Sequence, residues 1–135
     1  PMPSAHSFLV VDDSKLHHQM YSLIFSRGSL AGSTVYHALD GREGYSMLTA
    51  HPELTCVFLD LNMPGMNGLE FLERRRSDTM HPDIPVVMVT TEAKPEDEAR
   101  GRAAGAYDYL RKPFQPADVE AVVQRVLAAA RPPRG

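Results

Sequence analysis

Short apolar runs that end in a polar side chain are the feature that most constrains the fold of this 135-residue chain. The clearest run is Cys56–Leu59, which leads into Asp60 and is followed by Pro-Gly and Asn-Gly pairs. A short apolar run bounded by turn signals is typical of a strand that is buried on both faces. Such strands belong mostly to parallel sheets that helices cover. Asp60 would then lie at the carboxyl end of a central strand, where open α/β sheets bind their ligands.

The same pattern recurs along the chain and alternates with helical segments. Besides the run at 56–60, strands are expected at 8–11, 33–39, 84–89 and 106–110, and helices at 14–28, 44–50, 68–77, 92–104 and from 116 onward. Five strand–helix units in succession predict a parallel sheet built from right-handed crossovers. We therefore expect an α/β fold with a doubly wound, five-stranded parallel sheet and five helices. This domain would span residues 6–130, with a tail at 1–5 and a tail or linker stump at 131–135.

The sequence also predicts which helical side chains face inward. The buried face of the first helix is expected to consist of Leu16, Met20, Leu23 and Ile24, which recur at helical spacing. Asp40-Gly41 is expected to form a turn, and Arg74–Arg76 are expected to point outward. His17 and His18 are adjacent, so they do not share a helix face. We expect both histidines to be exposed, with a metal or pH role as the alternative.

Composition excludes several classes of protein. The formal charge of −3 does not favour a nucleic-acid or membrane partner. The single cysteine, Cys56, lies in an apolar run, which predicts a small core residue and a reducing compartment. No apolar stretch reaches the roughly 20 residues of a membrane helix, and residues 1–4 lack the features of a signal peptide. We expect a cytoplasmic protein, and the absence of glycine-rich phosphate loops argues against a dinucleotide-binding or nucleotide-hydrolysing fold.

Polar side chains at the strand ends predict a shared site. Asp12 and Asp13 follow the first strand, Asp60 ends the third, Thr90 follows the fourth and Lys112 follows the fifth. Because the carboxyl ends of parallel strands lie at one edge of the sheet, these groups should meet there. Neighbouring carboxylates repel one another unless a cation intervenes, and Mg²⁺ is commonly held by carboxylates and phosphate oxygens. With Mg²⁺ and Lys112 neutralising the incoming charge, Asp60 can act as the nucleophile toward a phosphoryl group.

Other interpretations remain open from the residues alone. The structural ones are capping by Asp12 and Asp13, an Asx turn at Asp60, strand closure by Thr90 and a solvated Lys112. A metal-dependent phosphohydrolase would need a second carboxylate two residues after Asp60, where the chain has Asn62. A flavin-binding electron carrier would need a Ser/Thr/Gly-rich loop where the chain has two aspartates. The joint occurrence of the polar groups at corresponding strand ends favours the phosphoryl site.

Four segments together resemble the receiver domain of two-component response regulators, and most closely the single-domain chemotaxis type. They are Phe8–Asp13, Leu59–Gly68, Val89–Lys94 and Tyr109–Phe114. The resemblance extends over nearly the whole chain and implies a flavodoxin-like fold with strand order 2-1-3-4-5. It implies a signalling phosphoacceptor that catalyses its own phosphorylation and slow dephosphorylation, rather than an enzyme acting on a separate substrate.

The resemblance also implies roles for individual residues. Asp60 resembles the phosphoacceptor, Asp13 a direct Mg²⁺ ligand, Asp12 a ligand acting through water, and Asn62 the source of a backbone carbonyl for the metal. Thr90 resembles the hydroxyl that moves toward the phosphoryl group, Tyr109 the aromatic switch residue that follows it, and Lys112 the phosphate-pairing lysine, whose bond to Pro113 is cis in the family. Asn62, Thr91 and Glu92 occupy positions that tune the lifetime of the phosphoryl group.

Thr91 departs from the family, which usually has a smaller residue there, often Ala. Its β-branched side chain is expected to narrow access to Asp60 and to slow phosphoryl entry or hydrolysis. The implied partners are a sensor histidine kinase or a histidine phosphotransfer protein, and a downstream protein that binds the fourth helix, fifth strand and fifth helix. No direct nucleic-acid or membrane partner is expected, and an effector domain after residue 135 remains open.

Overall fold

The computed structural model describes residues 6–61, 63, 68–77, 84–91 and 94–130. Within this range the strands are β1 (Ser7–Val11), β2 (Thr34–Ala38), β3 (Cys56–Asp60), β4 (Val86–Thr90) and β5 (Asp108–Arg111). The helices are α1 (Lys15–Phe25), α2 (Gly41–Ala50), α3 (Gly68–Ser77), α4 (Pro95–Ala103) and α5 (Pro116–Ala130), with a 3₁₀ turn at Gly28–Leu30. The predicted alternation of strands and helices is confirmed.

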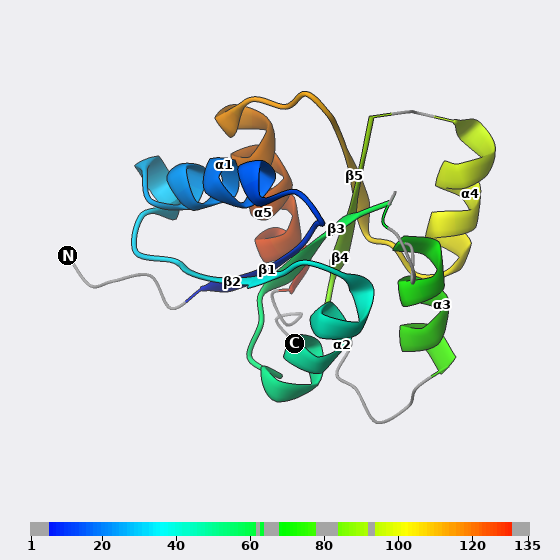
Figure 1. Ribbon diagram of the computed structural model, residues 1–135. Helices are drawn as coiled ribbons and strands as arrows, with labels where there is room; N and C mark the ends of the chain where they lie inside the picture. Colours follow the sequence, from blue (N-terminus) through cyan, green and yellow to red (C-terminus); the bar gives the residue numbers. More distant parts are fainter. Residues whose placement is uncertain (1–5, 62, 64–67, 78–83, 92–93, 131–135) are drawn as a thin grey trace, which may run out of the picture.

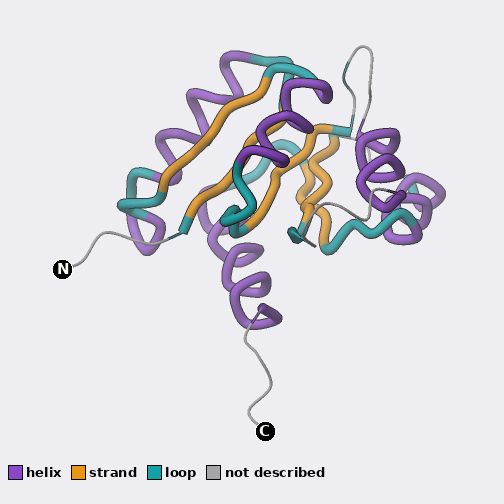
Figure 2. The backbone as a smooth tube through the Cα atoms, turned by 90° about the horizontal axis from the view of Figure 1, so that it is seen from below, coloured by secondary structure: helices purple, strands orange, loops and turns teal. Residues whose placement is uncertain are grey.

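The strands form one parallel sheet in the order β2-β1-β3-β4-β5. This confirms the predicted fold class and strand order. The three central strands, β1, β3 and β4, are buried along their whole length. Helices cover both faces of the sheet, with α1 and α5 on one face and α2, α3 and α4 on the other (Figures 1 and 2).

The central strands supply two separate hydrophobic cores, because successive side chains of a strand point to opposite faces. In β1, Phe8 and Val10 pack with side chains of α1 and α5, whereas Leu9 and Val11 pack with side chains of α2 and α3. β3 and β4 divide their side chains in the same way. Continuous apolar runs, rather than alternating ones, are therefore what a sheet covered on both faces requires.

The buried face of α1 differs from the predicted one. Of the four residues expected to face inward, Ile24 is buried, but Leu16, Met20 and Leu23 are exposed. The buried residues of the helix are His18, Tyr21, Ile24 and Phe25. Phe25 stacks on Phe8 with ring centroids 4.5 Å apart. Aromatic rings bury more surface than the aliphatic side chains that face solvent, so they set the rotation of the helix about its axis.

Two element boundaries also differ from the prediction. Asp40 does not belong to a separate turn; its carboxylate accepts a hydrogen bond of 2.7 Å from the Glu43 N–H, so it is the N-cap of α2. This capping starts the helix at Gly41, earlier than predicted. The second boundary is the end of α1, which was expected at Gly28. The helix stops at Phe25, and Gly28 adopts a positive φ of 60° in the 3₁₀ turn that follows.

Of the polar side chains predicted to be exposed, two are buried and a third is only half-exposed. Arg75 is buried, and its Nη2 donates to the Gly105 carbonyl over 3.4 Å, while its neighbours Arg74 and Arg76 are exposed as predicted. His18 is buried, and half-exposed His17 contacts Asp12. Polar side chains are buried in folded proteins when partners are available, and the partners here come from distant parts of the chain. In the described part of the chain, no helix has the length and apolar character that a membrane crossing needs.

Candidate functional site

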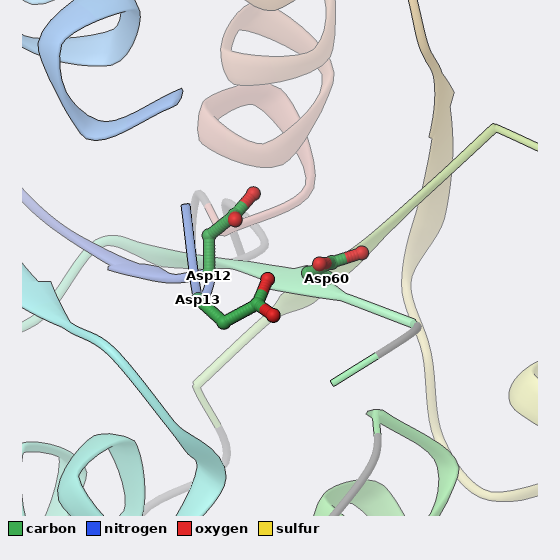
Figure 3. Close-up of side chains that lie close together, drawn as sticks. All are labelled: Asp12, Asp13 and Asp60. Carbon is green, nitrogen blue, oxygen red and sulfur yellow. The ribbon is translucent and has the colours of Figure 1, made fainter. Parts of the chain in front are cut away.

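The carboxyl ends of four strands bring the predicted polar side chains together. Asp12 and Asp13 follow β1, Asp60 ends β3, Thr90 ends β4 and Lys112 follows β5. The parallel register sets these ends side by side: Val11 lies opposite Leu59, and Thr90 lies opposite Arg111. Figure 3 shows the three aspartates gathered at this edge. One carboxylate oxygen from each lies within 4.8 Å of the other two.

The Asp12 carboxylate is buried and surrounded by donors. Its Oδ1 accepts from the Ser14 N–H over 2.8 Å, and its Oδ2 lies 2.9 Å from His17 Nδ1 and 3.2 Å from Lys112 Nζ. Burial by itself raises the pKa of Asp12, but the hydrogen bonds from Ser14 and His17 and the charge of Lys112 outweigh it, so the pKa is lower than usual. Asp12 is therefore ionised in the folded protein at neutral pH.

Lys112 joins two of the carboxylates. Its Nζ lies 3.2 Å from Asp12 Oδ2 and 3.6 Å from Asp60 Oδ1, and its side chain is only 11% exposed. The interpretation of Lys112 as a solvated surface lysine is therefore wrong. The peptide bond from Lys112 to Pro113 is cis, as the family resemblance implied. The backbone N–H of Lys112 donates to the Thr90 carbonyl over 2.8 Å, which fixes the lysine beside the end of β4.

Gly68 allows α3 to begin close against the backbone of Asp60 and Leu61. A Cβ on this residue would lie 2.8 Å from the Asp60 carbonyl oxygen and 2.9 Å from Leu61 Cα. Backbone atoms cannot yield to such a contact as a flexible side chain would. The Gly68 N–H donates to the Leu61 carbonyl over 3.1 Å, which closes the loop that follows Asp60. Gly68, the glycine of the predicted Asn-Gly step, thus allows a close backbone approach at the site.

Thr90 and Tyr109 both line a small cavity. The cavity has a volume of about 50 Å³ and is also lined by Leu61, Asp97 and Glu98. Tyr109 is half-buried, and its hydroxyl donates to the Asp97 and Glu98 carbonyls of α4 over 3.0 and 2.9 Å. Burial and the charge of Glu98 raise the pKa of Tyr109, so the phenol stays protonated, and the two carbonyls share its single O–H hydrogen. Thr90 and Tyr109 therefore border the same small space.

The contacts of His17 with Asp12 and Lys112 at this site were not predicted from the sequence. Its ring nitrogen lies 2.9 Å from Asp12 Oδ2 and 3.2 Å from Lys112 Nζ. The available signal was its position: it follows the N-cap Ser14 by three residues, and the Ser14 side chain accepts from the His17 N–H over 3.3 Å. Capping sets the first turn of α1 against the strand end, so a residue here reaches the aspartates.

Of three further residues expected to act at the site, only Thr91 lies within the described part of the chain. Asn62 and Glu92 lie outside the described residues, and Thr91 is exposed next to Thr90. The aspartate oxygens themselves form a donor set that suits a hard divalent cation, because they are all oxygen ligands and Lys112 leaves a net negative charge among them. The described residues therefore fit Mg²⁺.

Comparison with known proteins decides the family. The family model described as the response regulator receiver domain matches residues 8–124. This chain belongs to the response regulator receiver domain family. The chemotaxis protein CheY homolog of Campylobacter jejuni is 34% identical to this receiver domain over 119 residues, 88% of the chain and 90% of that protein. Chemotaxis protein CheY1 of Helicobacter pylori is also 34% identical, over 94% of its own length.

Solved structures place this receiver domain with the chemotaxis type. The chemotaxis protein CheY4 of Vibrio cholerae matches with a TM-score of 0.81 and 36% identity, covering 91% of this chain and 99% of that one. The receiver domain is therefore of the CheY type, as the sequence resemblance predicted. This assignment supports a phosphoacceptor switch in two-component signalling over the phosphohydrolase and the flavin carrier.

Proposed function

We propose that Asp60 takes a phosphoryl group from a phosphohistidine of a sensor kinase or a histidine phosphotransfer protein. The observation that carries this proposal is the position of Lys112 Nζ, 3.6 Å from Asp60 Oδ1 and 3.2 Å from Asp12 Oδ2, beside three clustered carboxylates. A nucleophilic carboxylate that receives an anionic group needs a cation beside it. Lys112 is the cation that can pair with both Asp60 and the incoming oxygens.

In the proposed reaction, an Asp60 carboxylate oxygen forms a bond to phosphorus as the phosphorus–nitrogen bond of the donor breaks. The nitrogen keeps the bonding electron pair and the donor leaves as histidine. Asp12 and Asp13 would hold Mg²⁺ together with Asp60 and the backbone carbonyl of Asn62. When bound, Mg²⁺ screens the negative charge between the carboxylates and the phosphoryl oxygens. Lys112 orients the same oxygens from the side of β5.

Phosphorylation would then act through Thr90 and Tyr109. The new group adds up to about two negative charges at the sheet edge, and the Thr90 hydroxyl is the donor that can move toward them. Thr90 and Tyr109 share a cavity of only about 50 Å³. Displacement of Thr90 enlarges the space that Tyr109 can enter, so the two side chains change position together. The phosphoryl group thereby biases an equilibrium between two states.

The readout would be a protein that binds α4, β5 and α5. A groove of about 450 Å³ lies between β5 and α5, lined by Tyr109, Arg111 and Arg125 among others. Because Tyr109 lines both this groove and the cavity beside Thr90, its movement changes the surface that a partner meets. We propose that this exchange takes place in the cytoplasm, between the kinase and a diffusing target, with the receiver domain supplying its own slow dephosphorylation.

The proposal is tested with beryllofluoride, which mimics a phosphoryl group on a carboxylate. Fluorine NMR in the presence of Mg²⁺ should show one bound species in the wild type and none in Asp60→Asn. Asp118→Asn is the matched control, since an amide oxygen can still accept from the Gln115 N–H as the carboxylate does over 2.8 Å. Binding that persists in Asp60→Asn would overturn the assignment of Asp60.

A further inference from the structure

Two histidines converge on one point between α1 and β2, outside the cluster of aspartates. His18 Nδ1 lies 2.6 Å from His37 Nδ1, and the two rings meet edge to face with centroids 4.7 Å apart. His18 is buried, and His37 is half-buried. The proposed phosphorylation chemistry uses neither ring, so the pair requires a separate explanation.

The outer nitrogen of each ring has an oxygen partner. His18 Nε2 lies 2.7 Å from the Asp12 carbonyl oxygen, and His37 Nε2 lies 3.1 Å from Ser22 Oγ. A carbonyl only accepts, so His18 carries its proton on Nε2, and its Nδ1 presents a lone pair to His37 when the ring is neutral. A serine hydroxyl accepts as well as donates, so His37 can also carry its proton on Nε2. Without a metal, the 2.6 Å contact is a hydrogen bond in which one Nδ1 carries the proton. With both protons on Nε2, that proton is absent, and both Nδ1 lone pairs become available to an ion between the rings.

We propose that His18 and His37 form a binding site for a borderline divalent transition metal, with Zn²⁺ as the representative ion. Histidine ligands characteristically donate their second ring N–H to a carbonyl or another oxygen. Both rings already have such a partner, one on the Asp12 backbone and one on Ser22. Two imidazoles supply two of the four positions of a tetrahedral zinc, and water from the half-exposed side of His37 completes the shell.

The site requires only a small opening. Zinc–nitrogen bonds of about 2.0–2.1 Å at a tetrahedral angle place the two nitrogens about 3.3 Å apart, compared with 2.6 Å in the structure. Rotation of the half-buried His37 ring provides this change without moving the backbone of β2. Burial and the neighbouring His18 lower the pKa of His37, so this ring is neutral, as a metal ligand must be.

The histidine site and the aspartate site select different ions. Imidazole nitrogens suit zinc, copper and nickel, whereas carboxylate and carbonyl oxygens suit magnesium. The two sites are nevertheless connected, because the hydrogen bond from His18 ends on the backbone carbonyl of Asp12. An ion at the histidine site would join α1 to β2 immediately behind the aspartates and stabilise the fold by mass action.

The experiment is a calorimetric titration of the full chain with ZnCl₂ in buffer saturated with Mg²⁺, so that the aspartates are occupied. We expect one Zn²⁺ equivalent in the wild type and a loss of affinity of about tenfold or more in His37→Gln. Because buried His18→Gln can fail to fold, circular dichroism is recorded for each variant. Half-exposed His37 supplies the primary test.

Two control variants separate the possible sites. His17→Gln removes the imidazole that contacts Asp12, and His51→Gln removes a half-buried histidine that stacks on Tyr36 in another part of the fold. Both should keep the Zn²⁺ equivalent, and Zn²⁺ should raise the thermal midpoint of both but not of His37→Gln. The inference is overturned if the wild type binds no Zn²⁺, if His37→Gln binds it unchanged, or if His17→Gln removes it.

Discussion

Substitution of Gly101 tests whether the space left by its missing side chain in α4 sets the position of Tyr109. Gly101 is buried, and a Cβ on this residue would overlap the Tyr109 hydroxyl oxygen and lie 3.1 Å from Tyr109 Cζ. The absent side chain therefore leaves room for the hydroxyl that bonds the Asp97 and Glu98 carbonyls. In Gly101→Ala the Tyr109 ring must leave this position and give up the hydrogen bond that the two carbonyls share.

The expected magnitude follows from two opposing terms. Loss of the hydroxyl hydrogen bond that the two carbonyls share costs about 0.5–1.5 kcal/mol, while replacing a glycine inside a helix by alanine contributes about 0.5–1 kcal/mol. Gly101→Ala should therefore change the free energy of unfolding by an amount between a gain of about 0.5 kcal/mol and a loss of about 1 kcal/mol. In a Tyr109→Phe background the overlapping oxygen is gone, so the same substitution should be neutral or stabilising.

The assay is urea unfolding of the wild type, the two single variants and the double variant. The free energies should give a coupling between positions 101 and 109 of about 0.5–1.5 kcal/mol. An equal effect of Gly101→Ala on the free energy of unfolding in the wild-type and Tyr109→Phe backgrounds would refute a role of Gly101 in positioning Tyr109. A coupled pair should also show changed phosphorylation-dependent binding of a partner in Gly101→Ala, because Tyr109 lines both the cavity beside Thr90 and the groove between β5 and α5.

Three further outcomes are expected. The folded-state pKa of Asp12 is depressed, so its contribution to stability is complete above the ordinary pKa of 3.8 and is lost as the pH falls through the folded value. In Mg²⁺-free urea titrations, Asp12→Asn should therefore lose less stability than the wild type between about pH 5 and pH 2. Equal losses in the two proteins would contradict the depressed pKa. Burial raises the pKa of the Cys56 thiol, so iodoacetamide should label it only after the protein is unfolded. Labelling is followed by mass spectrometry, and fast labelling of the native protein would contradict a buried thiol. Thr91→Ala should speed phosphoryl entry or hydrolysis by removing a β-branched side chain next to Thr90. Unchanged rates of phosphorylation by a small phosphodonor and of dephosphorylation would contradict that expectation.

The sheet and the residues at its edge were predictable because their signals are local. An apolar run that ends in Asp60 is visible within a few residues, and the topology of a parallel sheet then brings it near Asp12 and Lys112. Neither step depends on knowing which side chains touch. The limits of the domain at 6–130 and the tails at 1–5 and 131–135 stay predictions.

The helix faces were harder to predict because helical spacing alone allows several phases. In α1 the aliphatic residues Leu16 and Met20 suggested one face, but the aromatic contacts of Tyr21 and Phe25 select another. Buried polar residues were missed for a related reason. His18 is buried because His37, nineteen positions away, and the Asp12 carbonyl satisfy its nitrogens, and such pairings become visible only when the strands are placed.

The central claim, that Asp60 is the phosphoacceptor, is tested most directly by locating the phosphoryl group after transfer from an autophosphorylated histidine kinase. Borohydride reduces an acyl phosphate to an alcohol, which marks the modified aspartate for peptide mass spectrometry. The reduced residue should be found at position 60 and only in the presence of Mg²⁺, with Asp118→Asn as the unaffected control. A reduced residue at Asp12 or Asp13, or transfer that persists in Asp60→Asn, would contradict the account.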